Sequence, residues 1–285
     1  MLILPKGMAG ELNLPETVCG IASRVAHDAR PLRVGVLNLM PHKQVTDTDL
    51  VYALQAADVP LRILPVKIRG QQYKTTPAAY VQQYYTDFET VAADGLDRLI
   101  VTGAPLEQIP FEEVRYWPQL CDIMDWAHSH VRRTLHICWG AQAALYHYYG
   151  IDKRALPAKC FGIFRQHNLC PGHPLMRLMG EMFNMPNSRH TTIRREDVLA
   201  LSASGLCLLA DSAESGPGIV GTDDGRHAFV LGHFEYGPQT LDNEYRRDLS
   251  RGLSIAPPRH YYDKAGNIAY SWREAARTFY KSWVE

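Results

Sequence analysis

An excess of one charge sign and long apolar runs are both missing from this 285-residue sequence. Lys and Arg together number 30, as do Asp and Glu, so the formal net charge is zero. A balanced charge argues against the broad electrostatic surface that binds nucleic acid or an anionic membrane. No apolar run approaches the roughly 20 residues of a membrane-spanning helix, and the N-terminus lacks the basic region and apolar stretch of a signal peptide. These absences predict a cytoplasmic protein with no nucleic-acid or membrane partner.

Paired cysteines and metal-binding histidine motifs are also missing. The six cysteines, at positions 19, 121, 138, 160, 170 and 207, include no CxxC pair, so we expect neither a structural zinc site nor a disulfide framework. The twelve histidines include no HExxH pattern, which disfavours a metal enzyme. The sequence therefore predicts no metal site.

Apolar strands alternate with helical segments over the first half of the chain. Strand-like runs cover residues 33–40, 61–68, 96–101 and 134–137, and helix-like segments cover 46–57, 77–85, 117–130 and 139–149. Helix cap candidates occur at 46–49. Alternation of this kind predicts βαβ units, and thus an α/β fold with a mostly parallel sheet flanked by helices.

The rest of the chain is more broken in pattern. Short strand-like pieces occur at 162–165, 206–210 and 228–231, and helix-like segments at 240–253 and 272–283. No repeat or clear linker divides the chain, and a length of 285 residues with 46% hydrophobic residues allows a sizeable core. We expect an irregular N-terminal lead-in at 1–30 and a single α/β domain at 31–285.

One cysteine stands where an apolar strand runs into a helix. Cys138 follows Ile137 and directly precedes the helical segment that opens with Trp139. The unpaired N–H groups and positive end of a helix stabilise an anion, and this favours a nucleophilic thiolate. The Trp139 backbone N–H and the loop at Gly103 and Ala104, after another strand, would then supply an oxyanion hole. A buried core thiol is the alternative, and spacing alone leaves both interpretations open.

A histidine and a glutamate follow another apolar strand. His233 and Glu235 are two residues apart, so they project to the same side if the backbone stays extended. Glu235 could hold one ring nitrogen while the other faces Cys138, which is the arrangement that thioester chemistry requires. Ligands of parallel α/β sheets bind at the carboxyl ends of the strands, where both segments fall. Together they favour a Cys–His–Glu site over a surface histidine beside a solvated carboxylate.

Six short motifs occur in a fixed order along the chain. They are VLNLMP (36–41), VTGAPL (101–106), YWPQ (116–119), CWGAQA (138–143), NSR (187–189) and GHFEY (232–236). The set closely resembles the homoserine O-acyltransferases of the homoserine transsuccinylase type, over residues 31–283. The resemblance implies a fold similar to class I glutamine amidotransferases, which is flavodoxin-like, and it suggests a homodimer.

The resemblance also implies an activity and roles for single residues. An acyl-CoA would acylate the cysteine, and the acyl group would then pass to an amino-acid hydroxyl in a ping-pong reaction of methionine biosynthesis. Cys138 matches the nucleophile, His233 the general base and Glu235 its acidic partner. No permanently bound cofactor is implied, since acetyl-CoA would be a co-substrate.

Three further positions match residues that bind the amino-acid substrate in the family: Lys159, Ser188 and Arg247. An arginine can hold a carboxylate through two hydrogen bonds, and lysine and serine can orient the remaining groups. Without the resemblance, each of the three would be an ordinary surface or loop residue.

Glu107 matches the family position that discriminates between acyl donors. Glycine there leaves room for a succinyl group, whereas glutamate resembles the acetyl-specific members. A carboxylate fills the space and repels the free carboxylate of succinyl, so we expect acetyl-CoA to be preferred over succinyl-CoA.

The chain also departs from the family, and alternatives remain. Asn187 stands where many members have a histidine, which leaves L-serine open as the acceptor instead of L-homoserine; one methylene is worth only about 1–3 kcal/mol. A succinyl-CoA donor and a glutamine amidotransferase-type hydrolase are the other enzymatic alternatives. His136 stands two residues before Cys138, where amidotransferases usually carry glycine. A non-enzymatic binding module is disfavoured because all three catalytic residue types are present.

Overall fold

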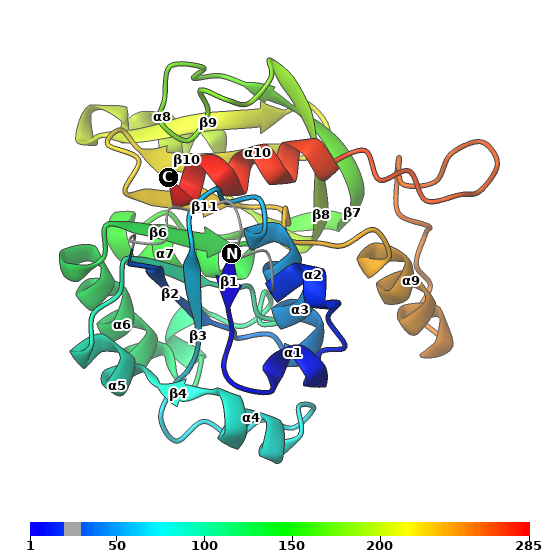
Figure 1. Ribbon diagram of the computed structural model, residues 1–285. Coiled ribbons are helices and arrows are strands. Elements are labelled where there is room, and N and C mark those ends of the chain that lie inside the picture. Colours follow the sequence, from blue (N-terminus) through cyan, green and yellow to red (C-terminus); the bar gives the residue numbers. More distant parts are fainter. Residues whose placement is uncertain (20–29) are drawn as a thin grey trace.

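A computed structural model describes residues 1–19 and 30–285, and these residues build an 11-stranded sheet (Figure 1). In chain order the strands are β1 (Leu2–Ile3), β2 (Leu32–Leu37), β3 (Leu61–Lys67), β4 (Thr86–Asp87), β5 (Arg98–Val101), β6 (Arg133–Ile137), β7 (Arg154–Asn168), β8 (Met182–Thr192), β9 (Leu206–Ser212), β10 (Gly216–Thr222) and β11 (His227–Val230). The strand order is β1-β3-β2-β5-β6-β11-β10-β9-β7-β8, and β4 pairs with β3.

Six neighbouring strands form the parallel part of the sheet. β1, β3, β2, β5, β6 and β11 all pair in parallel. The last pair places the carboxyl end of β11 beside that of β6, with Val230 opposite Ile137. The two sequence segments that bear the cysteine and the histidine therefore leave the sheet at the same edge.

The strands β7, β8, β9 and β10 form an antiparallel extension that the sequence predicts only in fragments. β7 and β8 pair over most of their length, and β9 and β10 connect this ribbon to β11. β7 is 15 residues long, whereas the expected strand covers only 162–165, and neither β8 nor β10 is predicted. A register shift between Ala155 and Cys160 interrupts the β7–β8 pairing and breaks the simple alternation of the sequence.

Helices cover both faces of the sheet. Their bounds are α1 (Met8–Glu11), α2 (Glu16–Cys19), α3 (Lys43–Leu54), α4 (Ala78–Tyr84), α5 (Phe88–Ala93), α6 (Trp117–His130), α7 (Trp139–Tyr149), α8 (Arg195–Ala200), α9 (Thr240–Ser250) and α10 (Arg273–Val284), with 3-10 turns at Phe111–Glu113 and Ser202–Ser204. β1 belongs to the N-terminal segment at 1–30 and pairs with β3 of the following domain. The domain boundary at residue 30 stays a prediction.

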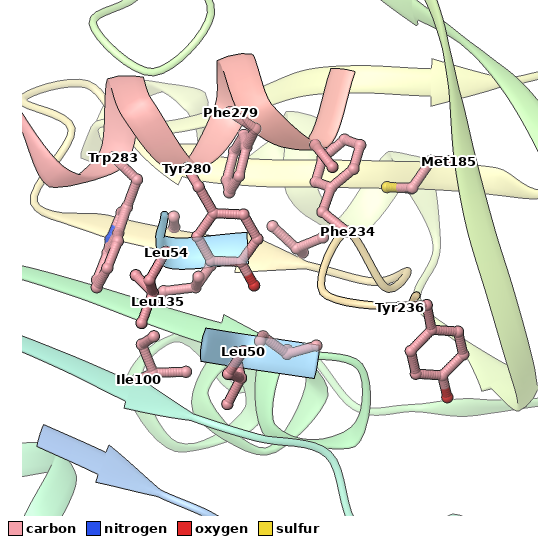
Figure 2. Close-up of a cluster of buried hydrophobic side chains, with 14 of the residues drawn as sticks. Leu50, Leu54, Ile100, Leu135, Met185, Phe234, Tyr236, Phe279, Tyr280 and Trp283 are labelled. Carbon is pink, nitrogen blue, oxygen red and sulfur yellow. The ribbon is translucent and has the colours of Figure 1, made fainter. Parts of the chain in front are cut away.

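Two large apolar clusters lie on opposite faces of the sheet. One unites α3 and α10 with the sheet, and Figure 2 shows Tyr280 and Trp283 of α10 pointing toward Leu54 of α3 and Leu135 of β6. The other unites α5, α6, α7 and α8 with the opposite face. This packing fixes α3 and α7 against the strands, and both helices border the candidate site.

Helix α3 begins earlier than expected. Lys43 is its first residue, so the cap candidates at 46–49 lie inside the helix. Asp47 is buried there and accepts hydrogen bonds from the hydroxyls of Tyr80 and Tyr85, at 2.8 and 2.6 Å. Its carboxylate serves tertiary contacts, which the local pattern does not reveal.

Two buried histidines should make the stability of the folded protein depend on pH. His136 is fully buried, and within the described ranges neither ring nitrogen has a hydrogen-bond partner. Burial holds the pKa of His136 well below 6.5 and lowers the pKa of His227 to about 4. Between pH 4 and 6.5 the unfolded chain therefore binds protons that the folded protein does not, so these groups lower stability as pH falls.

The variant His136→Phe isolates this effect, because phenylalanine fits beside the stacked ring of Phe229 and cannot be protonated. Relative to this variant, the unfolding free energy of the wild type should fall by up to about 1.4 kcal/mol per pH unit below pH 6.5. Urea denaturation of both proteins from pH 8 to pH 5 measures the difference. A difference that stays constant with pH would contradict a neutral His136 in the folded state.

Candidate active site

Cys138 lies in a strained turn between β6 and α7. Its φ and ψ are 52° and −115°, a positive φ that is rare for a residue with a side chain. Its N–H donates to the carbonyl of Val230 at 2.7 Å, which ties the turn to β11. At Gly140 a Cβ atom would stand 2.6 Å from the carbonyl oxygen of Thr102, so only glycine allows α7 to start this close to β5. The turn places the thiol at the carboxyl edge of the sheet.

His233 and Glu235 follow β11 and form a close pair beside this turn. The Nδ1 atom of His233 lies 2.6 Å from Oε1 of Glu235, and the two residues are only 3% and 7% exposed. The ring of Tyr236 stacks on the imidazole with centroids 4.1 Å apart. Figure 2 shows Phe234 from the same loop packed in the apolar cluster under α10. The loop is therefore anchored on both sides of the glutamate.

The electrostatics of the pair favour a protonated imidazole in the resting site. Burial alone would lower the pKa of His233, but the negative charges of Glu235 and Cys138 outweigh it and hold the pKa well above 6.5. Nδ1 is engaged by Glu235, and Nε2 is buried without a hydrogen-bond partner among the described residues. Nε2 is thus the nitrogen left to exchange a proton with the thiol or a substrate.

A hollow of about 230 Å³ opens at Cys138. The residues that line it are Met40, Pro41, Gly103, Ala104, Pro105, Glu107, Cys138, Lys159, Ser188, His190, His233, Tyr236, Glu244, Arg247 and Asp248. Eight of the ten predicted site residues are among them. Glu235 lies behind His233, and the Trp139 indole is buried in the opposite apolar cluster, so only its backbone could act at the site.

The predicted oxyanion residues lie around the thiol. A Cβ atom at Gly103 would stand 3.3 Å from the Cβ of Cys138 and 3.7 Å from the backbone nitrogen of Trp139. Gly103 and Ala104 line the same hollow as Cys138. The first N–H groups of α7 and the loop after β5 thus approach the thiol from two sides.

The three predicted substrate-binding residues meet on one wall of the hollow. The Nζ atom of Lys159 on β7 and the Oγ atom of Ser188 on β8 both donate to Oε1 of Glu244, each at 2.7 Å. Asp248 accepts from Arg247 at 2.7 Å and lies 3.4 Å from Lys159. The result is a polar cluster that joins the β7–β8 ribbon to α9.

The sequence interpretation missed Glu244 and Asp248. Both are on α9, four residues apart and hence on one face of the helix. Their spacing around Arg247 is a signal that could have found them. Asn187, the departure from the family pattern, is fully buried and accepts from Nε of Arg189 at 3.1 Å, so it does not line the hollow.

Glu107 lines the same hollow, and a hydrogen bond to β8 fixes its position. Its Oε1 atom accepts the backbone N–H of His190 at 3.0 Å, which holds the carboxylate at the rim of the hollow. Any acyl group carried by Cys138 in this space faces both the Glu107 carboxylate and the polar cluster on α9.

Neither a metal cluster nor a membrane helix occurs in the part of the chain that the structure describes. No group of three or more His, Cys, Asp or Glu side chains there could hold a metal ion. No described helix is long and apolar enough to cross a membrane. Cys121, Cys138, Cys160, Cys170 and Cys207 are all free thiols.

Comparison with known proteins identifies relatives over nearly the whole chain. The model of the family described as homoserine O-succinyltransferase matches residues 14–285. A homoserine O-acetyltransferase of Bacteroides fragilis is 47% identical over 260 residues, which cover 90% of this chain and 85% of that protein. A homoserine O-acetyltransferase of Parabacteroides distasonis is 48% identical and covers 90% and 83%.

Solved structures with the same fold are far more distant in sequence. A glutamine amidotransferase of Thermotoga maritima superposes with a TM-score of 0.60 at 11% identity, covering 90% of this chain and 98% of that chain. One from Methylobacillus flagellatus gives 0.56 at 13% identity, with 90% and 95% covered. These likenesses concern the fold alone, and they confirm the predicted mostly parallel sheet of the class I glutamine amidotransferase type.

Proposed function

Since the chain belongs to the homoserine O-succinyltransferase family, we propose that it moves an acetyl group from acetyl-CoA through a Cys138 thioester to the hydroxyl of L-homoserine. The family and the relatives bear out the predicted homoserine acyltransferase activity in methionine biosynthesis. The observation that carries the residue roles is the Cys138–His233–Glu235 arrangement at a hollow with a charged wall. The acetyl donor rests on Glu107 and on the names of the relatives.

In the first half-reaction the Cys138 thiolate attacks the thioester carbonyl of acetyl-CoA. The carbonyl oxygen becomes an oxyanion, which the backbone N–H groups at Trp139 and at the Gly103–Ala104 loop would stabilise. The carbon–sulfur bond to CoA then breaks, and the imidazolium of His233 gives its proton to the departing sulfur. The products are free CoA and an acetylated Cys138.

In the second half-reaction the acceptor hydroxyl attacks this new thioester. Acetylation removes the negative charge of the Cys138 thiolate, which is one of the two charges that raise the pKa of His233. The neutral imidazole can then take the hydroxyl proton while Glu235 holds Nδ1 and stabilises the charge that forms on the ring. Collapse of the second tetrahedral intermediate returns the thiolate and releases the acetyl ester.

The charged wall suits the zwitterionic end of an amino acid. Arg247 can bind the carboxylate of the acceptor through two hydrogen bonds, and Glu244 can accept from its ammonium group. Lys159 and Ser188 both contact Glu244 and thereby set its orientation. L-Serine would present the same two charged groups, but its hydroxyl is one methylene nearer to them. The distance from this wall to Cys138 therefore decides whether the hydroxyl of L-homoserine or that of L-serine reaches the thioester.

We also propose a cytoplasmic location, no permanently bound cofactor and a homodimer. These proposals follow from the resemblance and from the composition of the chain. All substrates would be small molecules.

The test is a matrix of donors and acceptors with the purified protein. Acetyl-CoA or succinyl-CoA is combined with L-homoserine, L-serine or L-glutamine, and release of the CoA thiol and of ammonia is followed. We expect rapid thiol release only with acetyl-CoA and L-homoserine. Faster release with L-serine would change the acceptor, and ammonia release from glutamine would refute acyl transfer as the function.

A further inference from the structure

A second hollow adjoins the one at Cys138. It measures about 240 Å³ and is lined by residues of α3, α9 and the loop before α3: Met40, Pro41, His42, Val45, Thr46, Asp49, Tyr236, Thr240, Asn243, Glu244 and Arg247. Five of these also line the first hollow, so the two spaces share a wall. A wider hollow of about 370 Å³ continues outward and again includes Val45, Asp49, Thr240 and Asn243. We call the space between α3 and α9 the α3–α9 groove.

The lining of the α3–α9 groove is mainly apolar by exposed area, and its charged residues Glu244 and Arg247 belong to the wall shared with the first hollow. Met40, Pro41 and Val45 supply the apolar part, and Val45 is 55% exposed although it is a large apolar side chain. Thr46 and Asn243 offer uncharged hydrogen-bonding groups. Away from the shared wall, this surface suits an alkyl chain interrupted by amides better than it suits a charged amino acid.

In the proposed reaction, the other sides of the first hollow already bind the acyl group and the acceptor. Glu107 and His190 bound the space where the acyl group lies, and Lys159 and Ser188 belong to the charged wall for the acceptor. The CoA thiol that is released when Cys138 is acetylated must therefore lie on a third side of the hollow. The side at Met40 and Tyr236 leads directly into the α3–α9 groove.

We propose that the pantetheine arm of the acyl-CoA donor lies in the α3–α9 groove between Val45 and Asn243. This proposal rests on the proposed function and adds a binding site for the donor. The two amides of the arm face Thr46 and Asn243, and its alkyl segments contact Met40, Pro41 and Val45. Burial raises the pKa of Asp49 to about 7, so near neutral pH its side chain is partly protonated and can donate to an amide carbonyl.

The shared wall has a consequence for the order of the reaction. Arg247 and Glu244 line both hollows, so the arm and the amino-acid acceptor approach the same side chains. We therefore expect CoA to leave before the acceptor binds, which is the order of a ping-pong reaction. High concentrations of L-homoserine should compete with acetyl-CoA for the free enzyme.

The variant Val45→Trp tests the proposal, because an indole on the exposed face of α3 would fill the groove without entering the core. Three thioester donors are compared: acetyl-CoA, S-acetylpantetheine and S-acetyl-N-acetylcysteamine, which lacks most of the arm. We expect kcat/KM to fall about tenfold or more for the first two donors and by less than about twofold for the short donor. Asn243→Ala should shift the same two donors in the same direction by a smaller factor.

Leu199→Trp on α8 is the matched control, since Leu199 is also exposed and lies outside the groove. Thermal unfolding of all variants checks that the fold is retained. An equal loss for all three donors, no loss for any, or a loss confined to acetyl-CoA would overturn the placement of the arm. Failure of the proposed function would look different, because the wild type would then transfer acetyl from none of the donors.

Discussion

Replacing Cys138 by alanine should abolish acetyl transfer, with kcat/KM reduced by at least roughly 10⁴-fold. The covalent route requires this thiol, and among the described residues no other cysteine lines the hollow. Cys160, which lies opposite Arg189 in the β7–β8 strand pair, is an alternative thiol, and burial raises its pKa. The loss should appear in thiol release from acetyl-CoA, and the mass of the protein after incubation with acetyl-CoA should stay unchanged.

Two controls separate loss of the nucleophile from loss of the fold. Cys160→Ala should retain near wild-type turnover, because this thiol does not line the hollow. Alanine and cysteine carry the same backbone strain at the positive φ of residue 138. The melting temperature of Cys138→Ala should therefore not fall. Near-normal turnover of Cys138→Ala would show that the acetyl group moves without an enzyme thioester.

The parts of the site that the sequence predicts are those set by local structure. A strand that ends at a cysteine followed by a helix defines a turn within a few residues, and a histidine and glutamate two residues apart share a side of the chain. β6 and β11 then needed only to be neighbours in the sheet, and parallel pairing places both ends at one edge. The geometry around Cys138 follows from these two facts.

The polar wall depends on contacts that no local pattern encodes. Lys159 and Glu244 are 85 residues apart, and they meet only because the β7–β8 ribbon extends beyond the parallel strands toward α9. Most of the ribbon escaped prediction for two reasons. The burial pattern of β7 does not alternate regularly, and in β8 the alternating buried positions include the polar residues Asn187, Arg189 and Thr191. Tyr236 likewise stacks on His233 in a loop whose path is fixed by Phe234 in the core.

Replacing Glu107 by glycine should shift donor preference toward succinyl-CoA. The carboxylate is held by the N–H of His190, so it cannot easily swing away from a succinyl carboxylate in the same space. Bringing two like charges together costs several kcal/mol, and glycine removes both the charge and the bulk. The ratio of kcat/KM for succinyl-CoA to that for acetyl-CoA should rise by about 10²-fold, equivalent to roughly 2.7 kcal/mol.

Glu107→Gln separates charge from size in this prediction. Glutamine keeps the length of the side chain and can still accept the His190 N–H through its amide oxygen. If repulsion dominates, Glu107→Gln should show most of the shift toward succinyl-CoA; if bulk dominates, only Glu107→Gly should show it. Should neither variant change the ratio, Glu107 would not discriminate between donors, and the preference for acetyl would have to arise elsewhere in the hollow at Cys138. Because either variant leaves Cys138, His233 and Glu235 untouched, turnover with acetyl-CoA should persist and makes the donor ratio measurable in each case.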